Sequence, residues 1–185
     1  MVRTFSDRPI DAVVVESILT TMTRVPSAGF TQGTEFLVLE GPKETARYWD
    51  ACLPPPLREN FKWPGLLIAP LLVVPLACEE AYRARYQEPD KLRAGGPEPD
   101  WVVPYWFVDA GFSALMGLLA AVDAGLGACF FRVVQPGSLR RSFGIPPGVE
   151  PVGTVAIGHP LDDRPSSSLR RPRREPEELI HRAGW

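Results

Sequence analysis

The sequence predicts one domain that contains both helices and strands. Segments with helical periodicity alternate with short apolar runs that end at glycine or proline. The chain has 185 residues, of which 45% are hydrophobic, and it carries 20 Lys and Arg against 22 Asp and Glu. This size and apolar content are typical of a single soluble domain. Because nucleic-acid binders and membrane-surface proteins carry a basic excess, we expect no nucleic-acid partner and no membrane.

The first quarter of the chain predicts two helices and one strand. Apolar residues recur every four positions in residues 9–24, which indicates a helix with Asp11 as its N-cap. Residues 26–33 contain two glycines and several polar side chains and predict an ordered loop, and the strand 35–40 follows it. A short helix is expected over 42–52, because three consecutive prolines end it.

The middle of the chain contains two long apolar runs. Residues 66–78 are too short and too interrupted by proline to span a bilayer, so their second half is predicted to be a buried strand. Residues 79–104 turn charged and glycine-rich, which predicts a helical turn and then a lid over a binding site. Residues 105–124 predict the longest helix, in which Asp109 and Asp123 argue against a membrane span.

The last third predicts two strands and a polar extension. The strands are expected at 128–133 and 153–158, both apolar. Residues 161–185 are rich in Pro, Ser and Arg and form a C-terminal extension, with a short helix expected over 176–182. No repeat or second domain is visible, so we assign 1–185 to one domain.

Small residues form a stripe on the long predicted helix. Ala110, Ala114, Gly117 and Ala121 recur at spacings of four, three and four, which allows another backbone to approach closely. The stripe fits a core helix packed on a sheet, and it fits equally a helix pair across a dimer interface. The spacing favours neither.

The cysteine and histidine content argues against metal and disulfide sites. Cys52, Cys78 and Cys129 lie far apart in apolar stretches, which is typical of buried thiols in a reducing cytoplasm. His159 and His181 have no partner at ligand spacing, so no metal site is expected. The first residues have no signal-peptide pattern, and we expect a cytoplasmic protein.

The known catalytic side-chain motifs are absent from the sequence. It has no nucleophile elbow, phosphate loop, zinc motif or Rossmann glycine triplet. Chemistry without side-chain catalysts usually depends on a cofactor. Residues 170–174 carry four arginines, whose guanidinium groups match phosphate oxygens. They indicate either a phosphate-bearing ligand or a solvated basic tail.

Several segments, in a fixed order, carry a family resemblance. They are RTF (3–5), RPI (8–10), PSAGFTQ (26–32), DAG (109–111), GLGACFF (125–131), RPRR (171–174) and IHR (180–182). Together they resemble the nitroreductase family of FMN-dependent oxidoreductases over nearly the whole chain.

The resemblance implies an α+β, nitroreductase-like fold with a central, mostly antiparallel sheet flanked by helices. It also implies a domain-swapped homodimer with two FMN molecules at the interface. Hydride passes from NADH or NADPH to flavin N5 and then to an organic acceptor such as a nitroaromatic compound or a quinone, in a ping-pong mechanism. Since the flavin does the chemistry, no catalytic side chain is expected.

The resemblance also assigns residues to the cofactor and acceptor. The loop at 27–32 would touch the ribityl chain and pyrimidine edge, the strand end at 130–133 would face the flavin ring, and the terminal arginines would lie near the phosphate. The lid would supply aromatic walls for the acceptor, or its aromatic rings would only pin the lid to the body. The cofactor candidates are Arg3, Ser27, Ala28, Gly29, Phe30, Gln32, Phe130, Phe131, Arg132, Val133, Arg171 and Arg173, and the substrate candidates are Tyr82, Tyr86 and Trp101.

Two departures from the family pattern leave alternatives open. The arginine-rich segment that usually precedes the position of Arg3 is missing, so the chain either belongs to a longer protein or binds FMN weakly. Arg132 stands where glycine is frequent, which would tighten the flavin face or recruit an anionic substrate. The alternatives are therefore a dimeric binding protein for a flavin-like or deazaflavin cofactor, with weak or no reductase activity, and a structural or regulatory dimer without a ligand.

Overall fold

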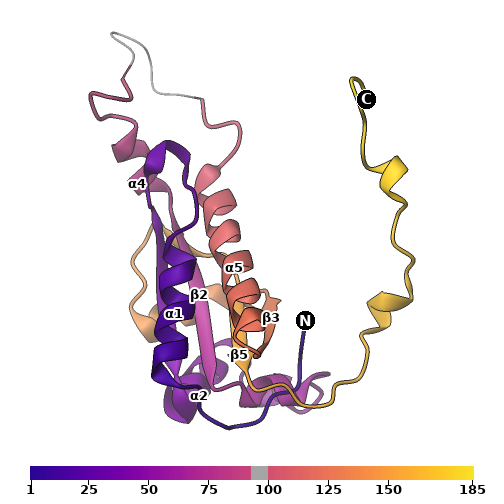
Figure 1. Ribbon diagram of the computed structural model, residues 1–185. Coiled ribbons are helices and arrows are strands. Elements are labelled where there is room, and N and C mark those ends of the chain that lie inside the picture. Colours follow the sequence, from indigo (N-terminus) through magenta and orange to yellow (C-terminus); the bar gives the residue numbers. More distant parts are fainter. Residues whose placement is uncertain (93–99) are drawn as a thin grey trace.

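An antiparallel sheet forms the centre of the protein, as seen in a computed structural model that describes residues 1–92 and 100–185 (Figure 1). Four strands lie in the order β1-β2-β5-β3, and a short strand, β4, pairs with β2 beside β5. The α+β fold with a mostly antiparallel sheet is confirmed. The strands are β1 (Thr34–Glu40), β2 (Leu71–Cys78), β3 (Gly127–Phe131), β4 (Val149–Pro151) and β5 (Thr154–Gly158).

Helices cover both faces of this sheet. One face packs on α1 (Ala12–Thr23) and α5 (Tyr105–Asp123), which run side by side in Figure 1. The other face packs on α2 (Gly41–Cys52) and α6 (Pro136–Phe143). Shorter helical elements are α3 (Pro55–Arg58), the 3-10 helix Pro64–Ile68 and α4 (Glu79–Arg85).

Strand β2 explains why the apolar run at 66–78 does not alternate with polar residues. Leu71 and Val73 point to the α1 and α5 face, while Leu72 and Val74 point to the α2 face. A strand covered on both sides buries every side chain, so it becomes continuously hydrophobic. The expected strand is confirmed in the second half of the run.

Local signals set several helix ends where the sequence predicts them. Asp11 caps α1, because its carboxylate accepts a hydrogen bond of 2.8 Å from the N–H of Val13. Gly125 has a φ of 73°, a left-handed conformation that lets the chain leave α5 and enter β3. Helix α6 was not expected, and its last turn ends at Gly144, which has a φ of 66°.

The small-residue stripe of α5 is a core feature within one chain. Ala110, Ala114, Gly117 and Ala121 are all buried in the single protomer. A Cβ added to Gly117 would lie 2.8 Å from the Sδ atom of Met22 on α1. The close approach is therefore between α5 and α1 of the same chain, and the helix-pair interpretation of this stripe is wrong.

Helix α5 is also, among the residues described, the one helix long and apolar enough to cross a membrane. In the fold it packs against β2, β3, β5 and α1. Its length and composition therefore match a central core helix as well.

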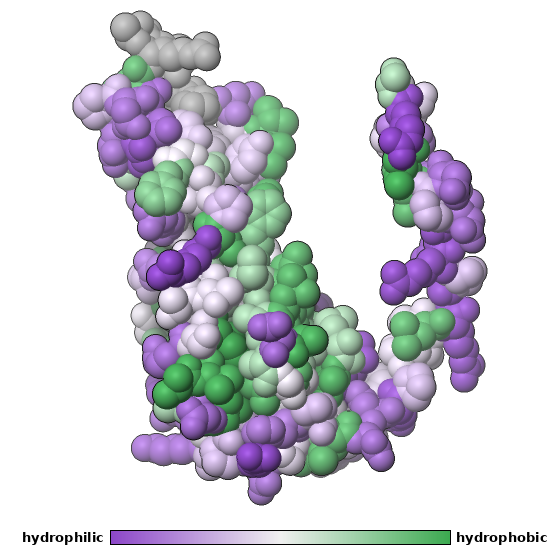
Figure 2. Space-filling view, in the orientation of Figure 1, coloured by the Kyte–Doolittle hydropathy of each residue, from purple (hydrophilic) through white to green (hydrophobic). Residues whose placement is uncertain are grey.

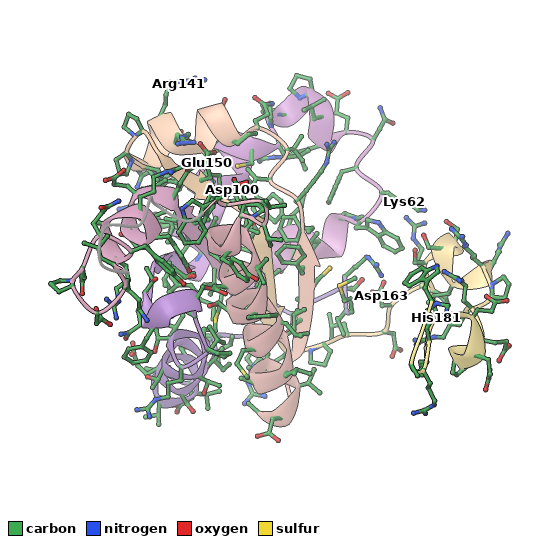
Figure 3. The ribbon with its side chains drawn as sticks, turned by 90° about the horizontal axis from the view of Figure 1, so that it is seen from above. Lys62, Asp100, Arg141, Glu150, Asp163 and His181 are labelled. Carbon is green, nitrogen blue, oxygen red and sulfur yellow. The ribbon has the colours of Figure 1, made fainter. Side chains whose placement is uncertain are left out.

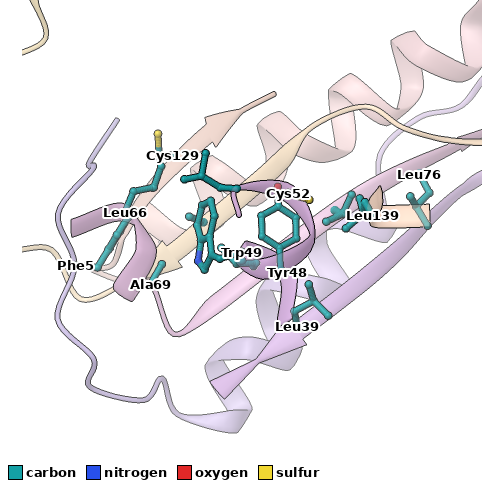
Figure 4. Packing of buried hydrophobic residues seen from close by; sticks show 14 of the residues in the cluster. Phe5, Leu39, Tyr48, Trp49, Cys52, Leu66, Ala69, Leu76, Cys129 and Leu139 are labelled. Carbon is teal, nitrogen blue, oxygen red and sulfur yellow. The ribbon is translucent and has the colours of Figure 1, made fainter. Parts of the chain in front are cut away.

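The second face of the sheet has an aromatic core (Figure 4). Tyr48 and Trp49 of α2 lie against the sheet with their rings 5.0 Å apart, edge to face. The Tyr48 hydroxyl lies 2.8 Å from the Thr154 hydroxyl, which satisfies both buried groups. This core fixes α2 above the end of β3.

The C-terminal segment leaves the body as an arm (Figure 1). Every residue from 167 to 185 is exposed, and Leu169, Leu179, Ile180 and Trp185 are large apolar side chains among them. The helix expected over 176–182 is wrong, since only the short 3-10 turn Pro176–Glu178 forms. Without packing, so short a segment has little to stabilise a helix.

Candidate functional site

A cavity of about 290 Å³ opens between α2, the 3-10 helix Pro64–Ile68 and the end of β3. Its walls are mainly apolar and include six aromatic residues, of which Trp49 and Phe131 stack with centroids 5.6 Å apart and an interplanar angle of 13°. A flat apolar ligand suits such walls. The lining residues are Arg3, Tyr48, Trp49, Cys52, Leu53, Phe61, Trp63, Leu66, Cys129, Phe130, Phe131, Arg132 and Val134.

Three cations gather on one ring at the rim of this cavity. The Arg3 and Arg164 guanidinium groups lie 4.9 and 4.8 Å from the centre of the Trp63 ring, and the Lys62 ammonium lies 5.2 Å from it. Within residues 1–92 and 100–185, none of the three forms an ion pair with a carboxylate. We call Arg3, Lys62 and Arg164 the cation cluster.

The carboxylate nearest in sequence to the cation cluster is already engaged. Asp163 accepts hydrogen bonds from the backbone N–H of Arg3 (2.6 Å) and the hydroxyl of Thr4 (3.2 Å). Figure 3 shows Lys62 and Asp163 on the side of the body that faces the arm. The Arg3 side chain thus keeps its positive charge available for an anion while its backbone is held in place.

Two thiols of the cavity wall are kept neutral. Burial raises the pKa of Cys52 to about 11 and also raises the pKa of Cys129. A neutral buried thiol is a poor nucleophile. These cysteines therefore act as apolar wall residues.

The loop at 27–32 lies at a second, smaller cavity of about 200 Å³. Ser27 and Gln32 line it together with Asp109 and Ser113 of α5. The Ser113 hydroxyl is buried and has no hydrogen-bond partner among the described residues, so it is available to a polar ligand atom or a water molecule. This cavity shares no lining residue with the aromatic one.

The aromatic residues of the expected lid pack around the same loop. Tyr82 is fully buried and its hydroxyl donates to Asp109, so its ring has no face open to a substrate in this chain. Tyr86 and Trp101 are half-buried and meet edge to face at 4.8 Å. Residues 93–99 of the lid lie outside the described residues.

The predicted cofactor residues thus fall into three groups. Arg3, Phe130, Phe131 and Arg132 line the aromatic cavity. Phe130 and Phe131 belong to the cores on opposite faces of the sheet, and Val133 packs against the core on the α2 face and is not among the residues that line the cavity. The remaining residues are Ser27, Ala28, Gly29, Phe30 and Gln32 in the loop, and Arg171 and Arg173 on the exposed arm.

Sequence reasoning missed three residues of the aromatic cavity and its rim. Lys62, Trp63 and Arg164 belong to no motif, and the cation cluster joins residues about 60 and 160 positions from Arg3. Two backbone contacts bring them to the N-terminal segment, because the Leu161 N–H donates to the Thr4 carbonyl and the Phe5 N–H donates to the Gly65 carbonyl.

Comparison with known proteins places this geometry in a family. The family model "Nitroreductase family" matches residues 1–159. The chain belongs to the nitroreductase family. The resemblance seen in the sequence is confirmed.

Solved structures share the fold of this nitroreductase-family chain at low sequence identity. An FMN-dependent nitroreductase from Clostridium difficile R20291 matches with a TM-score of 0.71 and 17% identity, covering 100% of this chain and 94% of the other. A nitroreductase family protein from Clostridium difficile 630 matches with a TM-score of 0.71 and 16% identity, covering 100% and 93%. NfrA1 of B. megaterium matches with a TM-score of 0.75 and 16% identity, covering 100% and 70%. The family assignment supports a flavin oxidoreductase in general terms.

Proposed function

We propose that the protein is an FMN-dependent oxidoreductase that transfers hydride from NADH or NADPH to an organic acceptor. The observation that carries the proposal is the aromatic cavity whose rim holds the cation cluster. Trp63 belongs to the cavity wall, and its ring also contacts all three cations. A ligand with a flat ring system and a phosphate group matches both parts at once.

The residues present fit FMN on chemical grounds. A phosphate group carries the negative charge that would pair with the cation cluster, and guanidinium groups bind phosphate oxygens in pairs. When bound, FMN supplies a site that accepts and donates hydride, so the protein needs no general base of its own. Arg3, Lys62 and Arg164 would hold the phosphate, and the backbone at 130–132 would lie beside the ring system.

We further propose that the working unit is a homodimer. The loop at 27–32 and the aromatic cavity are separate in one chain, so a second copy is needed if both are to contact one cofactor. No described part of the same chain covers the arm that carries Arg171 and Arg173. In a dimer it would lie against the partner and bring these arginines toward a phosphate.

An apolar surface is available for this association. On α5, Leu115, Leu119 and Val122 are 52%, 55% and 63% exposed, and Val13 of α1 is 77% exposed. Figure 2 shows hydrophobic residues gathered over this part of the molecule. Exposed apolar surfaces of this kind usually mark an interface. The cytoplasmic location, the reductant and the acceptor stay predictions.

The binding test uses one reversal of charge at the cation cluster. Wild-type protein should bind FMN in a fluorescence titration, while Arg164→Glu should weaken binding by about 10- to 100-fold, since a charge-assisted contact contributes about 1.5 to 3 kcal/mol. The control is Arg141→Glu, which places the same charge change at an exposed position of α6. A wild-type protein that binds no FMN, or an equal effect of both variants, would contradict the proposal.

Two further measurements separate the alternatives. Equilibrium dialysis against FMN and a deazaflavin should favour FMN, and a preference for the deazaflavin would support the binding-protein alternative. Steady oxidation of NADH or NADPH with a quinone or nitroaromatic acceptor should be seen with the FMN-loaded protein. Cofactor binding without turnover would support the cofactor-binding dimer. If the protein shows neither binding nor turnover, the structural dimer is the alternative that is left.

A further inference from the structure

The loop at 27–32 has a backbone conformation that its sequence does not favour by itself. Gly29, Phe30 and Gln32 have φ values of 64°, 56° and 53°. Residues other than glycine rarely adopt this left-handed region, because their Cβ approaches the backbone too closely. The conformation therefore needs support from outside the loop.

Asp109 supplies one support. This carboxylate lies on α5 and is only 3% exposed. Its Oδ2 atom accepts hydrogen bonds from the Ala28 N–H at 2.9 Å and from the Tyr82 hydroxyl at 2.7 Å. Burial and the bond to Asp109 both raise the pKa of Tyr82, so its hydroxyl stays protonated as a donor. The start of the loop is thereby tied to the core helix.

Arg85 of α4 supplies the second support. Its Nε atom donates a bond of 3.0 Å to the Gly29 carbonyl, and its terminal nitrogens are held by Asp90 at 2.6 and 2.7 Å and by Glu88 at 2.8 Å. The next residue, Tyr86, lies against Gly29, where an added Cβ would be 2.7 Å from the ring. The middle of the loop is therefore fixed by the first part of the lid.

We infer that Asp109 and Arg85 are positioning residues that hold the loop at 27–32 in the shape the cofactor requires. The inference rests on the proposed function for the identity of the cofactor, and the restraint itself is a property of the single chain. It assigns a role to the lid before any acceptor binds. Residues 79–92 set the affinity for flavin through the loop, in addition to covering the acceptor.

The restraint can be measured without cofactor by amide hydrogen exchange. The N–H groups of Ala28, Phe30, Thr31 and Gln32 are all hydrogen-bonded, and only the first bonds to a residue outside the loop. Removing an outside support should raise their exchange rates and leave those of β2 and β5 unchanged. We expect about 10- to 100-fold faster exchange in Asp109→Leu and Arg85→Met, from the loss of one or two charge-assisted bonds.

A conservative variant and a matched control sharpen the test. Asp109→Asn keeps an acceptor oxygen where both donors meet, so it should recover most of the protection that Asp109→Leu loses. Arg141→Met removes an arginine from exposed α6 and should change nothing in the loop. In an FMN titration, Asp109→Leu and Arg85→Met should bind about 10- to 100-fold more weakly than wild type, with Asp109→Asn between them and wild type.

The outcomes separate this inference from the proposed function. Unchanged exchange at 28–32 in Arg85→Met would overturn the inference whether or not FMN binds, and that variant remains informative if Asp109→Leu does not fold. Faster exchange with unchanged FMN affinity would also overturn it. A wild-type protein that binds no FMN would overturn the proposed function alone, because the exchange data would still decide whether the loop is held from outside.

Discussion

Two glycines of α5 provide a direct test of the packing between α5 and α1. Both Gly111 and Gly117 lie inside the helix, where replacing glycine by alanine gains about 0.8 to 1 kcal/mol of helix propensity. Among the described residues of one chain, a Cβ on Gly111 would meet nothing within 4 Å, whereas a Cβ on Gly117 would lie 2.8 Å from the Sδ of Met22, which is fully buried. The same substitution should therefore have different effects at the two sites.

The magnitudes follow from these contacts. Gly111→Ala should raise the free energy of unfolding by about 1 kcal/mol, which corresponds to about 2 to 4 °C in Tm for a chain of this size. Gly117→Ala gains the same propensity but loses about 1 kcal/mol to overpacking, the low end of the usual range, because the atoms it meets belong to the flexible end of the Met22 side chain. It should therefore be less stable than Gly111→Ala by about 1 kcal/mol.

Urea unfolding followed by circular dichroism measures both free energies, and a second substitution assigns the cause. In the Gly117→Ala background, Met22→Ala should cost less than it does in wild type, with a coupling of about 0.5 to 3 kcal/mol for residues in contact. Equal stability of the two alanine variants, or no coupling with Met22, would refute the argument that this stripe packs within the chain. Gly117→Leu should then unfold the protomer and not merely separate a dimer.

Three further predictions concern the ligand, the interface and pH. Arg173→Glu should lower FMN occupancy without changing the dimer mass, and unchanged occupancy in an absorbance spectrum would exclude the arm from the phosphate site. Leu119→Asp should shift the mass measured by light scattering toward that of the monomer, because a charge would be buried in an apolar interface. An unchanged mass would show that the dimer interface does not include Leu119. Since burial raises the pKa of Cys52 from 9.0 to about 11, the folded protein favours the neutral thiol, so this stabilisation is complete below pH 9 and is lost as the pH rises to 11. The loss should be about 2 to 3 kcal/mol, and Cys52→Ala should remove that part of the pH dependence of the unfolding free energy. If the unfolding free energies of wild type and Cys52→Ala depend on pH with the same slope, the raised pKa of Cys52 is contradicted.

Much of the fold could be predicted because its signals are local. The Asp11 cap, the uninterrupted apolar run of β2 and the positive φ of Gly125 each act within a few residues. Helix α6 was missed because its single buried side chain, Leu139, gives too little periodicity. The helix expected at 176–182 does not form for a different reason. Its apolar residues are exposed and pack against no surface in the described part of the chain.

The candidate site could be predicted only in pieces. The segments that carry the family resemblance contain Arg3, the loop at 27–32 and the end of β3, and these do line cavities. Nothing in the sequence shows that the loop and the strand end lie in different cavities of one chain. The role of Asp109 was also hidden, because its two donors, Ala28 and Tyr82, lie 81 and 27 positions away.

Local signals in the sequence were enough to predict most of the longer helices and strands, the burial of β2 and the family resemblance, because caps, turns and hydrophobic periodicity depend on near neighbours. Three features depend on the folded chain: Arg3, Lys62 and Arg164 meet on Trp63, Gly117 of α5 packs against Met22, and Asp109 and Arg85 contact the loop at 27–32. Such contacts join residues far apart in the chain, and they arise from the packing of elements on the sheet, which local patterns do not encode.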